Sequence, residues 1–243
     1  MLGLAGLIFV VGMLLIILPL FRVKTIVVEG NSYYSAEQII EASGIEVGQE
    51  ILGVDVDAVC QAIWAECLYV NEIGVGKSFS KITIVISERE NVMYTEFNGD
   101  YYSLDSNFRV LERSEDAADF SDFLRVELPQ IQSLSIGKPL HFEKEEMDLS
   151  YIGELIGVLE EQEILDRVTS IDFSKKYSVS YVMDNTCRVE LGRVDDLSLK
   201  LEIISGILEM KGDLGGMSAV VDVTNLSKPT FRLLGASDTL LSD

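Results

Sequence analysis

The chain opens on an unbroken apolar segment. Residues 2–21 read LGLAGLIFVVGMLLIILPLF and include no charged or strongly polar side chain. A helix of this length rises about 30 Å, which matches the hydrocarbon core of a bilayer. We therefore predict one transmembrane helix over residues 2–21, which anchors the remainder of the chain in a cell membrane.

Two other interpretations of this segment are weaker. A signal peptide has a basic region, an apolar core of about 7–15 residues and small residues before its cleavage site. Here no basic residue comes first, and the segment ends on the bulky Pro19-Leu20-Phe21. A buried helix of a globular protein normally has a polar face. Arg22 and Lys24 follow the segment and by themselves favour a cytoplasmic globular part, although long domains cross membranes largely regardless of such charges.

The charge of the chain restricts its partners. Of 243 residues, 40 are Asp or Glu and 19 are Lys or Arg, which gives a net charge of −21. Such a surface is repelled by nucleic acid and by anionic lipid head groups, so we expect a basic or neutral protein partner. The three cysteines, Cys60, Cys67 and Cys187, are too few for a disulfide framework. We interpret them as small buried apolar residues.

Residues 22–90 have the pattern of a small α+β unit. We expect strands over residues 23–29, 69–75 and 81–87, and helices that begin at Ser35 and near Asp55. Ser35 and Gln38 have the spacing of a capping box, and Gly44 is placed to end that helix. The order strand, helix, helix, strand, strand predicts two helices on one face of a three-stranded sheet.

Residues 91–235 indicate a mainly β unit with two covering helices. Hairpin turns are expected at Asn98-Gly99 and Asp184-Asn185. We expect strands over 93–97, 100–105, 108–111, 168–173, 177–183, 186–191, 219–223 and 230–234, helices over 143–161 and 195–211, and an acidic loop over 112–122. The predicted fold class is α+β, divided into a transmembrane helix (1–21), a first domain (22–90), a β domain (91–235) and a C-terminal tail (236–243).

Signals for catalysis are nearly absent. The chain has one histidine, His141, beside Phe142 in a predicted loop, and no motif with the ligand spacing of a zinc site. Gly76-Lys77-Ser78 resembles the end of a P-loop, but no helix is expected after it to hold phosphate at its N-terminus. We therefore predict no catalytic, cofactor-binding or metal-binding residues and no enzymatic activity. The functional features that remain are the anchor and sheet edges that can accept another strand.

Several short motifs follow one another along the chain. They are FRVKTIVVEGN at 21–31, ITIVISER at 82–89, YYSLD at 101–105 with FRVL at 108–111, LPQI at 128–131 and VDV at 221–223. With the N-terminal anchor, this order resembles the FtsQ/DivIB family of bacterial cell-division proteins over nearly the whole chain. The chain departs from the family pattern at Phe79-Ser80 and Glu90-Asn91, where the family has proline, and at Thr224, where it often has arginine.

The resemblance implies a POTRA domain over residues 22–90, followed by the β domain of the family. It implies a cytoplasmic N-terminus and a globular part outside the cytoplasm, at the division septum. It further implies a non-enzymatic scaffold that binds single-pass division proteins of the FtsL and DivIC/FtsB type. Such a scaffold links these partners to peptidoglycan synthesis.

The resemblance also implies where a partner binds, namely the C-terminal end of the β domain, where a partner segment adds to an edge strand. The residues that we expect to bind are Thr224, Asn225, Ser227, Thr230, Phe231, Arg232, Leu233 and Leu234. The alternative is an ordinary edge strand that binds nothing.

Two other functions fit parts of the pattern. One is another POTRA-bearing assembly or secretion factor, which normally carries several such units or a β-barrel. The other is a membrane-tethered hydrolase, which needs a nucleophile–base pair or metal ligands.

Overall fold

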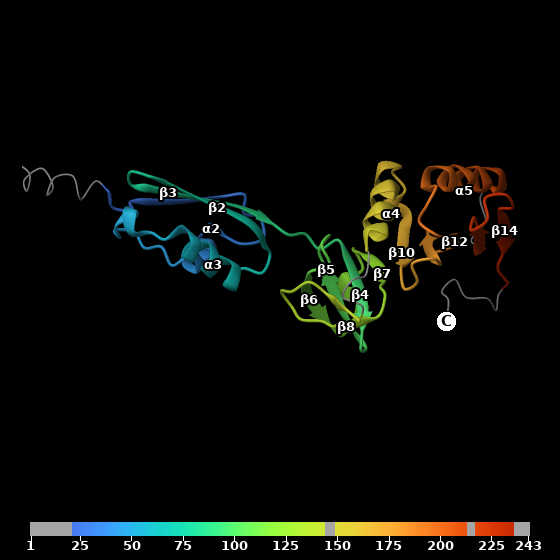
Figure 1. Ribbon diagram of the computed structural model, residues 1–243, viewed down its shortest axis with the longest axis horizontal. Helices are drawn as coiled ribbons and strands as arrows, with labels where there is room; N and C mark the ends of the chain where they lie inside the picture. The colour runs from blue at the N-terminus through green and yellow to red at the C-terminus, as the bar shows by residue number, and fades with distance from the viewer. Residues whose placement is uncertain (1–20, 144–148, 213–216, 236–243) are drawn as a thin grey trace, which may run out of the picture. The chain divides into compact units, whose positions relative to one another are not determined.

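The computed structural model describes residues 21–143, 149–212 and 217–235. The predicted transmembrane helix lies outside these residues except for Phe21, and so does the predicted tail over 236–243. Within the described ranges, no helix is both long enough and apolar enough to span a bilayer. The chain divides into two compact units, one that ends at Glu90 and one that begins at Asn91 (Figure 1).

The first unit is a three-stranded sheet with two helices. Its elements are β1 (Thr25–Glu29), α2 (Ala36–Ser43), the 3-10 helix η2 (Ile51–Gly53), α3 (Val56–Glu66), β2 (Val70–Ser78) and β3 (Lys81–Glu88). The strand order is β1-β3-β2, with β1 parallel and β2 antiparallel to β3. Both helices lie on one face of the sheet (Figure 1), and Ile39, Ile63 and Ile84 are fully buried. The predicted order of elements is confirmed.

Side-chain caps explain where the two helices begin. The Gln38 amide donates to Ser35 Oγ (3.2 Å) and the Ser35 amide donates to Gln38 Oε1 (2.8 Å), so the predicted capping box is formed. Gly44 ends α2 in the left-handed conformation, with φ of 65°. At the start of α3, Asp55 Oδ1 accepts the amides of Asp57 (3.0 Å) and Ala58 (3.3 Å). These bonds satisfy amides that the first turn of a helix leaves without a partner.

The turn after β1 is held against the end of β3 by two features. The Glu88 carboxylate accepts three consecutive backbone amides, those of Ser32 (2.7 Å), Tyr33 (2.5 Å) and Tyr34 (3.0 Å). Gly30 has φ of +85°, and a Cβ atom there would lie 2.0 Å from the carbonyl oxygen of Ile86. The chain therefore needs glycine at this position both for its backbone conformation and for its close approach to β3.

We expect Gly30→Ala to lower the free energy of unfolding of the first unit by about 2 kcal/mol or more, because backbone strain and a backbone clash add together. Gly48→Ala is the matched control, since Gly48 also has positive φ (97°) but nothing lies within 4 Å of its missing Cβ. Urea denaturation followed by the fluorescence of Trp64, the one tryptophan of the chain, reports on this unit. Equal losses in the two variants would contradict the packing role of Gly30.

The second unit is built on a nine-stranded sheet. Its strands are β4 (Met93–Phe97), β5 (Asp100–Leu104), β6 (Val110–Ser114), β7 (Leu124–Glu127), β10 (Val168–Asp172), β11 (Val179–Met183), β12 (Cys187–Gly192), β13 (Ala219–Asp222) and β14 (Thr230–Leu233), in the spatial order β14-β13-β12-β11-β10-β7-β4-β5-β6. A separate pair is formed by β8 (Ile131–Ser133) and β9 (His141–Phe142). The helices are α4 (Ser150–Glu161) and α5 (Leu197–Lys211), with 3-10 helices η3 (Ala117–Phe120) and η4 (Leu165–Arg167).

One face of this sheet forms the core of the second unit. The register places one residue from each of six neighbouring strands in a single row, which we call the buried row: Val126, Ile171, Tyr181, Val189, Val221 and Phe231. The first five are buried and Phe231 is half-buried, and α4 and α5 pack on this face (Figure 1). Because side chains alternate along a strand, the neighbours of the buried row lie on the opposite face.

Both predicted hairpin turns are present. Asn98 and Gly99 have φ of 54° and 88°, and Asp184 and Asn185 have φ of 53° and 56°. Positive φ at both central residues is the conformation of a type I′ turn, which suits the twist of the flanking strands. Asn, Asp and Gly adopt it more easily than other residues, so these turns follow from local sequence.

Some expectations for the second unit were wrong. Of the helix predicted over 143–161, the structure shows α4 from Ser150 to Glu161, and residues 144–148 lie outside the described ranges. Glu143 is not helical, and its amide bonds to the Gln130 carbonyl (3.0 Å) beside the β8–β9 pair. The predicted acidic loop over 112–122 contains the end of β6 and the 3-10 helix η3, whose Phe120 is buried. His141 lies in β9 rather than in a loop.

In the first unit, Lys77 lies within β2, where its Nζ donates to the Val54 carbonyl (2.9 Å).

Candidate partner-binding edge

All eight predicted binding residues fall in one hairpin at one edge of the nine-stranded sheet. Thr230 to Leu233 form β14, and Leu234 follows it directly. Thr224, Asn225 and Ser227 lie in the turn between β13 and β14. Among the described strands, β14 pairs with β13 alone, so its other side is an open edge (Figure 1, red).

Local hydrogen bonds hold the turn of this hairpin. Asp222 Oδ1 accepts both the amide (2.8 Å) and the hydroxyl (2.7 Å) of Thr224. Asn225 Oδ1 accepts the Ser227 amide (3.0 Å), and the Asn225 carbonyl accepts the Lys228 amide (3.0 Å). These are side-chain turns of the kind that Asp and Asn favour. Thr224, Asn225 and Ser227 therefore shape the turn that positions β14 and do not belong to the strand that presents the open edge.

The register decides which backbone groups of β14 face outward. The Leu234 amide donates to the Ser218 carbonyl (2.8 Å), and Arg232 lies opposite Val220. In an antiparallel pair the bonded residues alternate, so Thr230, Arg232 and Leu234 bond to β13. The amide and carbonyl groups of Phe231 and Leu233 then point away from the sheet, where a further strand can pair with them.

The side chains of β14 offer different chemistry on the two faces. Phe231 belongs to the buried row, and Lys211 Nζ at the end of α5 lies 5.0 Å from the centre of its ring. Leu233 points to the same face and is 46% exposed. Arg232 points to the opposite face. A strand that pairs with β14 would thus meet apolar side chains on the helix side and a cation on the other side.

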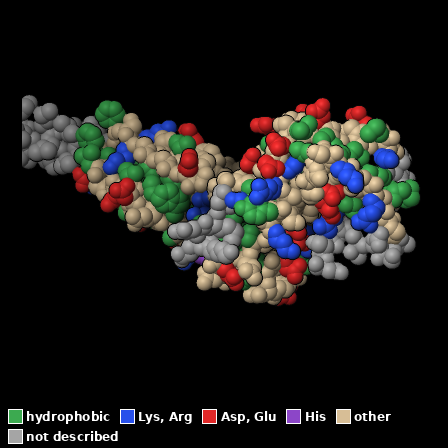
Figure 2. All heavy atoms as spheres, turned by 45° about the vertical axis from the view of Figure 1, so that its right-hand side comes forward, with side chains coloured by type: hydrophobic (Ala, Val, Ile, Leu, Met, Phe, Trp, Pro, Cys, Tyr) green, Lys and Arg blue, Asp and Glu red, His purple; other side chains and the backbone are tan. Residues whose placement is uncertain are grey.

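Charged side chains on the opposite face are arranged in two rows that run across the strands. The first row contains Arg125, Arg188 and Arg232, and the second contains Glu127, Asp172, Glu190 and Asp222. The rows neutralise each other in part, because Arg188 lies 3.8 Å from Glu190 and Arg125 lies 3.6 Å from Glu127. Figure 2 shows basic and acidic side chains side by side on the second unit.

The side chains of Cys187 and Tyr181 are ionisable groups that are buried in the core of the second unit. Burial raises the pKa of the Cys187 thiol to about 11 and raises the pKa of the Tyr181 hydroxyl. All three cysteines are free thiols; Cys67 and Cys187 are buried as predicted, whereas Cys60 is half-buried. The residues that the structure describes contain no group of acidic, His and Cys side chains that could hold a metal ion.

The opposite edge of the sheet is partly covered. At β6, the Val110 amide donates to the Lys138 carbonyl (3.0 Å), and the Gly137 amide donates to the Val110 carbonyl (2.8 Å). The Leu140 amide also bonds to the Phe108 carbonyl (2.9 Å). Within the described ranges, the edge of β6 is thus bonded in part to residues 137–138, whereas β14 pairs with β13 alone.

We expect the four amides of residues 231–234 to exchange with solvent in an alternating pattern. Arg232 and Leu234 should be protected by β13, whereas Phe231 and Leu233 should exchange about 10-fold faster or more, because they lack a partner strand. Residue-resolved amide exchange measured by NMR on the full chain in detergent micelles tests this. Equal protection at all four amides would mean that the edge is already occupied or that the register differs.

Comparison with known families agrees with this architecture. Residues 21–89 match the POTRA domain of the FtsQ type, and residues 93–224 match the C-terminal region of the cell-division protein FtsQ/DivIB. The chain is thus of the class of proteins in which a small POTRA domain is followed by a β domain. This chain belongs to the FtsQ/DivIB family of cell-division proteins. The second match ends at residue 224, so β14 lies beyond it.

Several curated relatives match this chain over most of their length, and they share one name. The cell division protein DivIB of Clostridium acetobutylicum is 25% identical over 218 residues, which cover 89% of this chain and 84% of that protein. DivIB of Clostridium botulinum is 23% identical over 218 residues (89% and 83%). DivIB of Clostridium tetani is 23% identical over 198 residues (82% and 74%). These relatives support a role in cell division.

Proposed function

We propose that this protein is a non-enzymatic scaffold of the division complex. Residues 2–21 anchor it in the cell membrane, and both units lie outside the cytoplasm at the septum. There it binds single-pass division proteins of the FtsL and DivIC/FtsB type and links them to peptidoglycan synthesis. The observation that carries the proposal is the open edge of β14, which ends the sheet of a protein from a cell-division family.

Binding occurs by strand addition. An extended partner segment pairs with the outward backbone groups of Phe231 and Leu233, and its side chains alternate between the two faces. On the helix side, apolar partner residues pack beside Leu233. On the other side, an acidic partner residue meets Arg232. Pro229 has no amide hydrogen, so the pairing begins beyond it.

We expect Leu233→Pro to weaken partner binding at least about 10-fold, or about 1.4 kcal/mol, because it removes an outward donor and leaves every bond to β13 in place. Leu233→Ala is the matched control, since it trims the same side chain but keeps the amide. Affinity can be measured in pull-downs of FtsL- and DivIC-type partners by the full chain. Arg232→Pro removes a bond to β13 and should disturb the hairpin itself. Unchanged partner binding by the Leu233→Pro variant would contradict the proposal that a partner strand pairs with this edge.

The cellular part of the proposal is tested separately. We expect fluorescently tagged full-length protein to form a midcell band in dividing cells of the source bacterium. The Leu233→Pro variant should remain in the membrane but lose much of this band if partners recruit the protein through β14. A diffuse membrane signal of the unaltered protein would count against a septal role, whatever the outcome of the binding experiment.

A further inference from the structure

The first unit is acidic, but most of its basic residues lie together at one end. Residues 22–90 contain eleven Asp or Glu and five Lys or Arg. Four of these five are Arg22, Lys24, Lys77 and Lys81. They lie where β1 begins and where β2 turns into β3, which is one end of the three-stranded sheet (Figure 1). The fold therefore concentrates these cations, because two come from each of two distant segments.

Three segments of the chain meet at this end, which we call the basic end: residues 21–24, 46–55 and 77–81. The Lys24 amide donates to the Ser80 carbonyl (2.7 Å), which joins the first segment to the third. The Arg22 guanidinium donates to the Gly48 carbonyl (2.8 Å), which joins the first segment to the second. The basic end is thus a single bonded part of the first unit.

Two lysines of the basic end keep their charge available for a ligand. Lys24 and Lys81 are exposed, and within the described ranges neither forms an ion pair. The acidic residues of the same end are Glu46, Glu50 and Asp55, and the Asp55 carboxylate is already bonded to amides of α3. The chain as a whole is repelled by anionic lipid, but this end has an excess of positive charge.

An exposed aromatic ring lies among these cations. Phe79 is the first of the two residues between β2 and β3, and its side chain is 75% exposed. Its φ of 38° is positive, a conformation for which a turn favours glycine. Leu52 and Val47 are also exposed at the basic end, and Figure 2 shows apolar and basic side chains together there. Neither the turn nor the core of the unit accounts for an aromatic side chain at Phe79.

The position of Phe79 relative to the predicted anchor suggests what this ring contacts. Phe21 is the last residue of the apolar segment over 2–21, and its ring centre lies 6.3 Å from that of Phe79. With residues 2–21 in the bilayer, as the proposed function requires, Phe21 lies at the boundary between hydrocarbon and head groups. Phe79 is then held at the same boundary, where aromatic side chains are favoured and lysines reach lipid phosphates.

We propose that the basic end docks on the membrane surface, with Phe79 inserted among the head groups and Lys24 and Lys81 bound to the phosphates of anionic lipids. Lys81 lies on the open face of the sheet and Lys77 on the face that carries the helices, so cations flank the ring on both sides. A single anchoring helix leaves the first unit free to tilt. A second contact beside it holds the unit in one orientation on the membrane.

A tryptophan placed at the tip of the turn tests this contact. The full chain with Trp64→Phe and Phe79→Trp carries its one tryptophan at position 79. The protein is incorporated into nanodiscs of phosphatidylcholine, with or without an equal amount of phosphatidylglycerol, that contain a lipid with a nitroxide close to its head group. We expect emission at shorter wavelength and at least about 2-fold stronger quenching when phosphatidylglycerol is present. The unaltered chain, with Trp64 on α3, is the control and should show no such dependence.

Lipid charge separates docking from mere closeness to the anchor. The anchor alone brings position 79 near the bilayer, but it does not make the depth of the ring depend on phosphatidylglycerol. Lys24→Gln with Lys81→Gln should abolish that dependence in the position-79 reporter. Lys138→Gln with Lys175→Gln removes the same charge from the second unit and should leave the dependence in place. Slow exchange of the Ile84 amide, in the central strand β3, shows that the first unit of each variant is folded.

Three outcomes would overturn the proposal in distinguishable ways. A chain that does not co-elute with the nanodiscs would contradict the anchor itself, and with it the docking that rests on the anchor. Co-elution with equal quenching in both kinds of nanodisc would contradict docking alone and would leave the proposed function in place. Emission at short wavelength that the nitroxide does not quench would mean that protein, such as a second copy of this chain, covers position 79.

Discussion

The buried row of the nine-stranded sheet is the constraint on which the second unit depends. Its apolar side chains have to pack under α4 and α5, and a slip of one residue in any strand would turn that strand's core side chains to solvent. The register of β14 is thereby set by Phe231 and Val221. The same register turns the backbone groups of Phe231 and Leu233 outward and places Arg232 on the charged face. A packing requirement thus determines what a partner strand would encounter.

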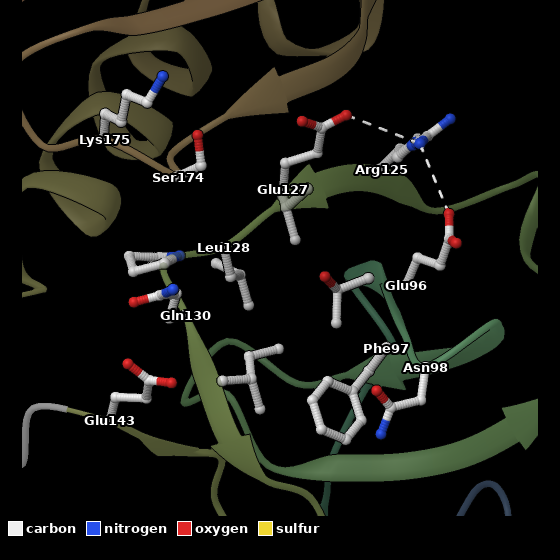
Figure 3. A pocket seen from close by; sticks show the side chains of 14 residues that line it. Glu96, Phe97, Asn98, Arg125, Glu127, Leu128, Gln130, Glu143, Ser174 and Lys175 are labelled. Atoms are coloured by element: carbon white, nitrogen blue, oxygen red, sulfur yellow. Dashed lines mark ion pairs between the residues drawn. The ribbon is translucent and has the colours of Figure 1, made fainter. Parts of the chain in front are cut away.

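Charge is distributed unevenly over the second unit. The edge of β14 lies beside Lys211, Lys228 and Arg232, although the chain as a whole is strongly acidic. The cavity beside β4 and β7 is instead lined by three carboxylates and two cations among its charged side chains (Figure 3).

The sequence was most informative where structure is determined by neighbouring residues. The capping box of Ser35 and Gln38, the helix end at Gly44 and the two type I′ turns are all local, and all were predicted. It was less informative where long-range pairing decides. The four-residue strand β7 and the pair β8–β9 were missed, because such short segments carry too little periodicity to be recognised. Glu143 was predicted to lie in a helix, although its amide donates a hydrogen bond to the Gln130 carbonyl.

By itself, the sequence determined the family, the order of most elements, the apolar N-terminal segment and the hairpin that contains Phe231 and Leu233. These depend on composition, on spacing along the chain and on short motifs. Only the tertiary structure decided that β14 ends the sheet and which of its amides face outward. The physical reason is that alternation along a strand reveals which face a residue occupies, but not which strand lies beside it.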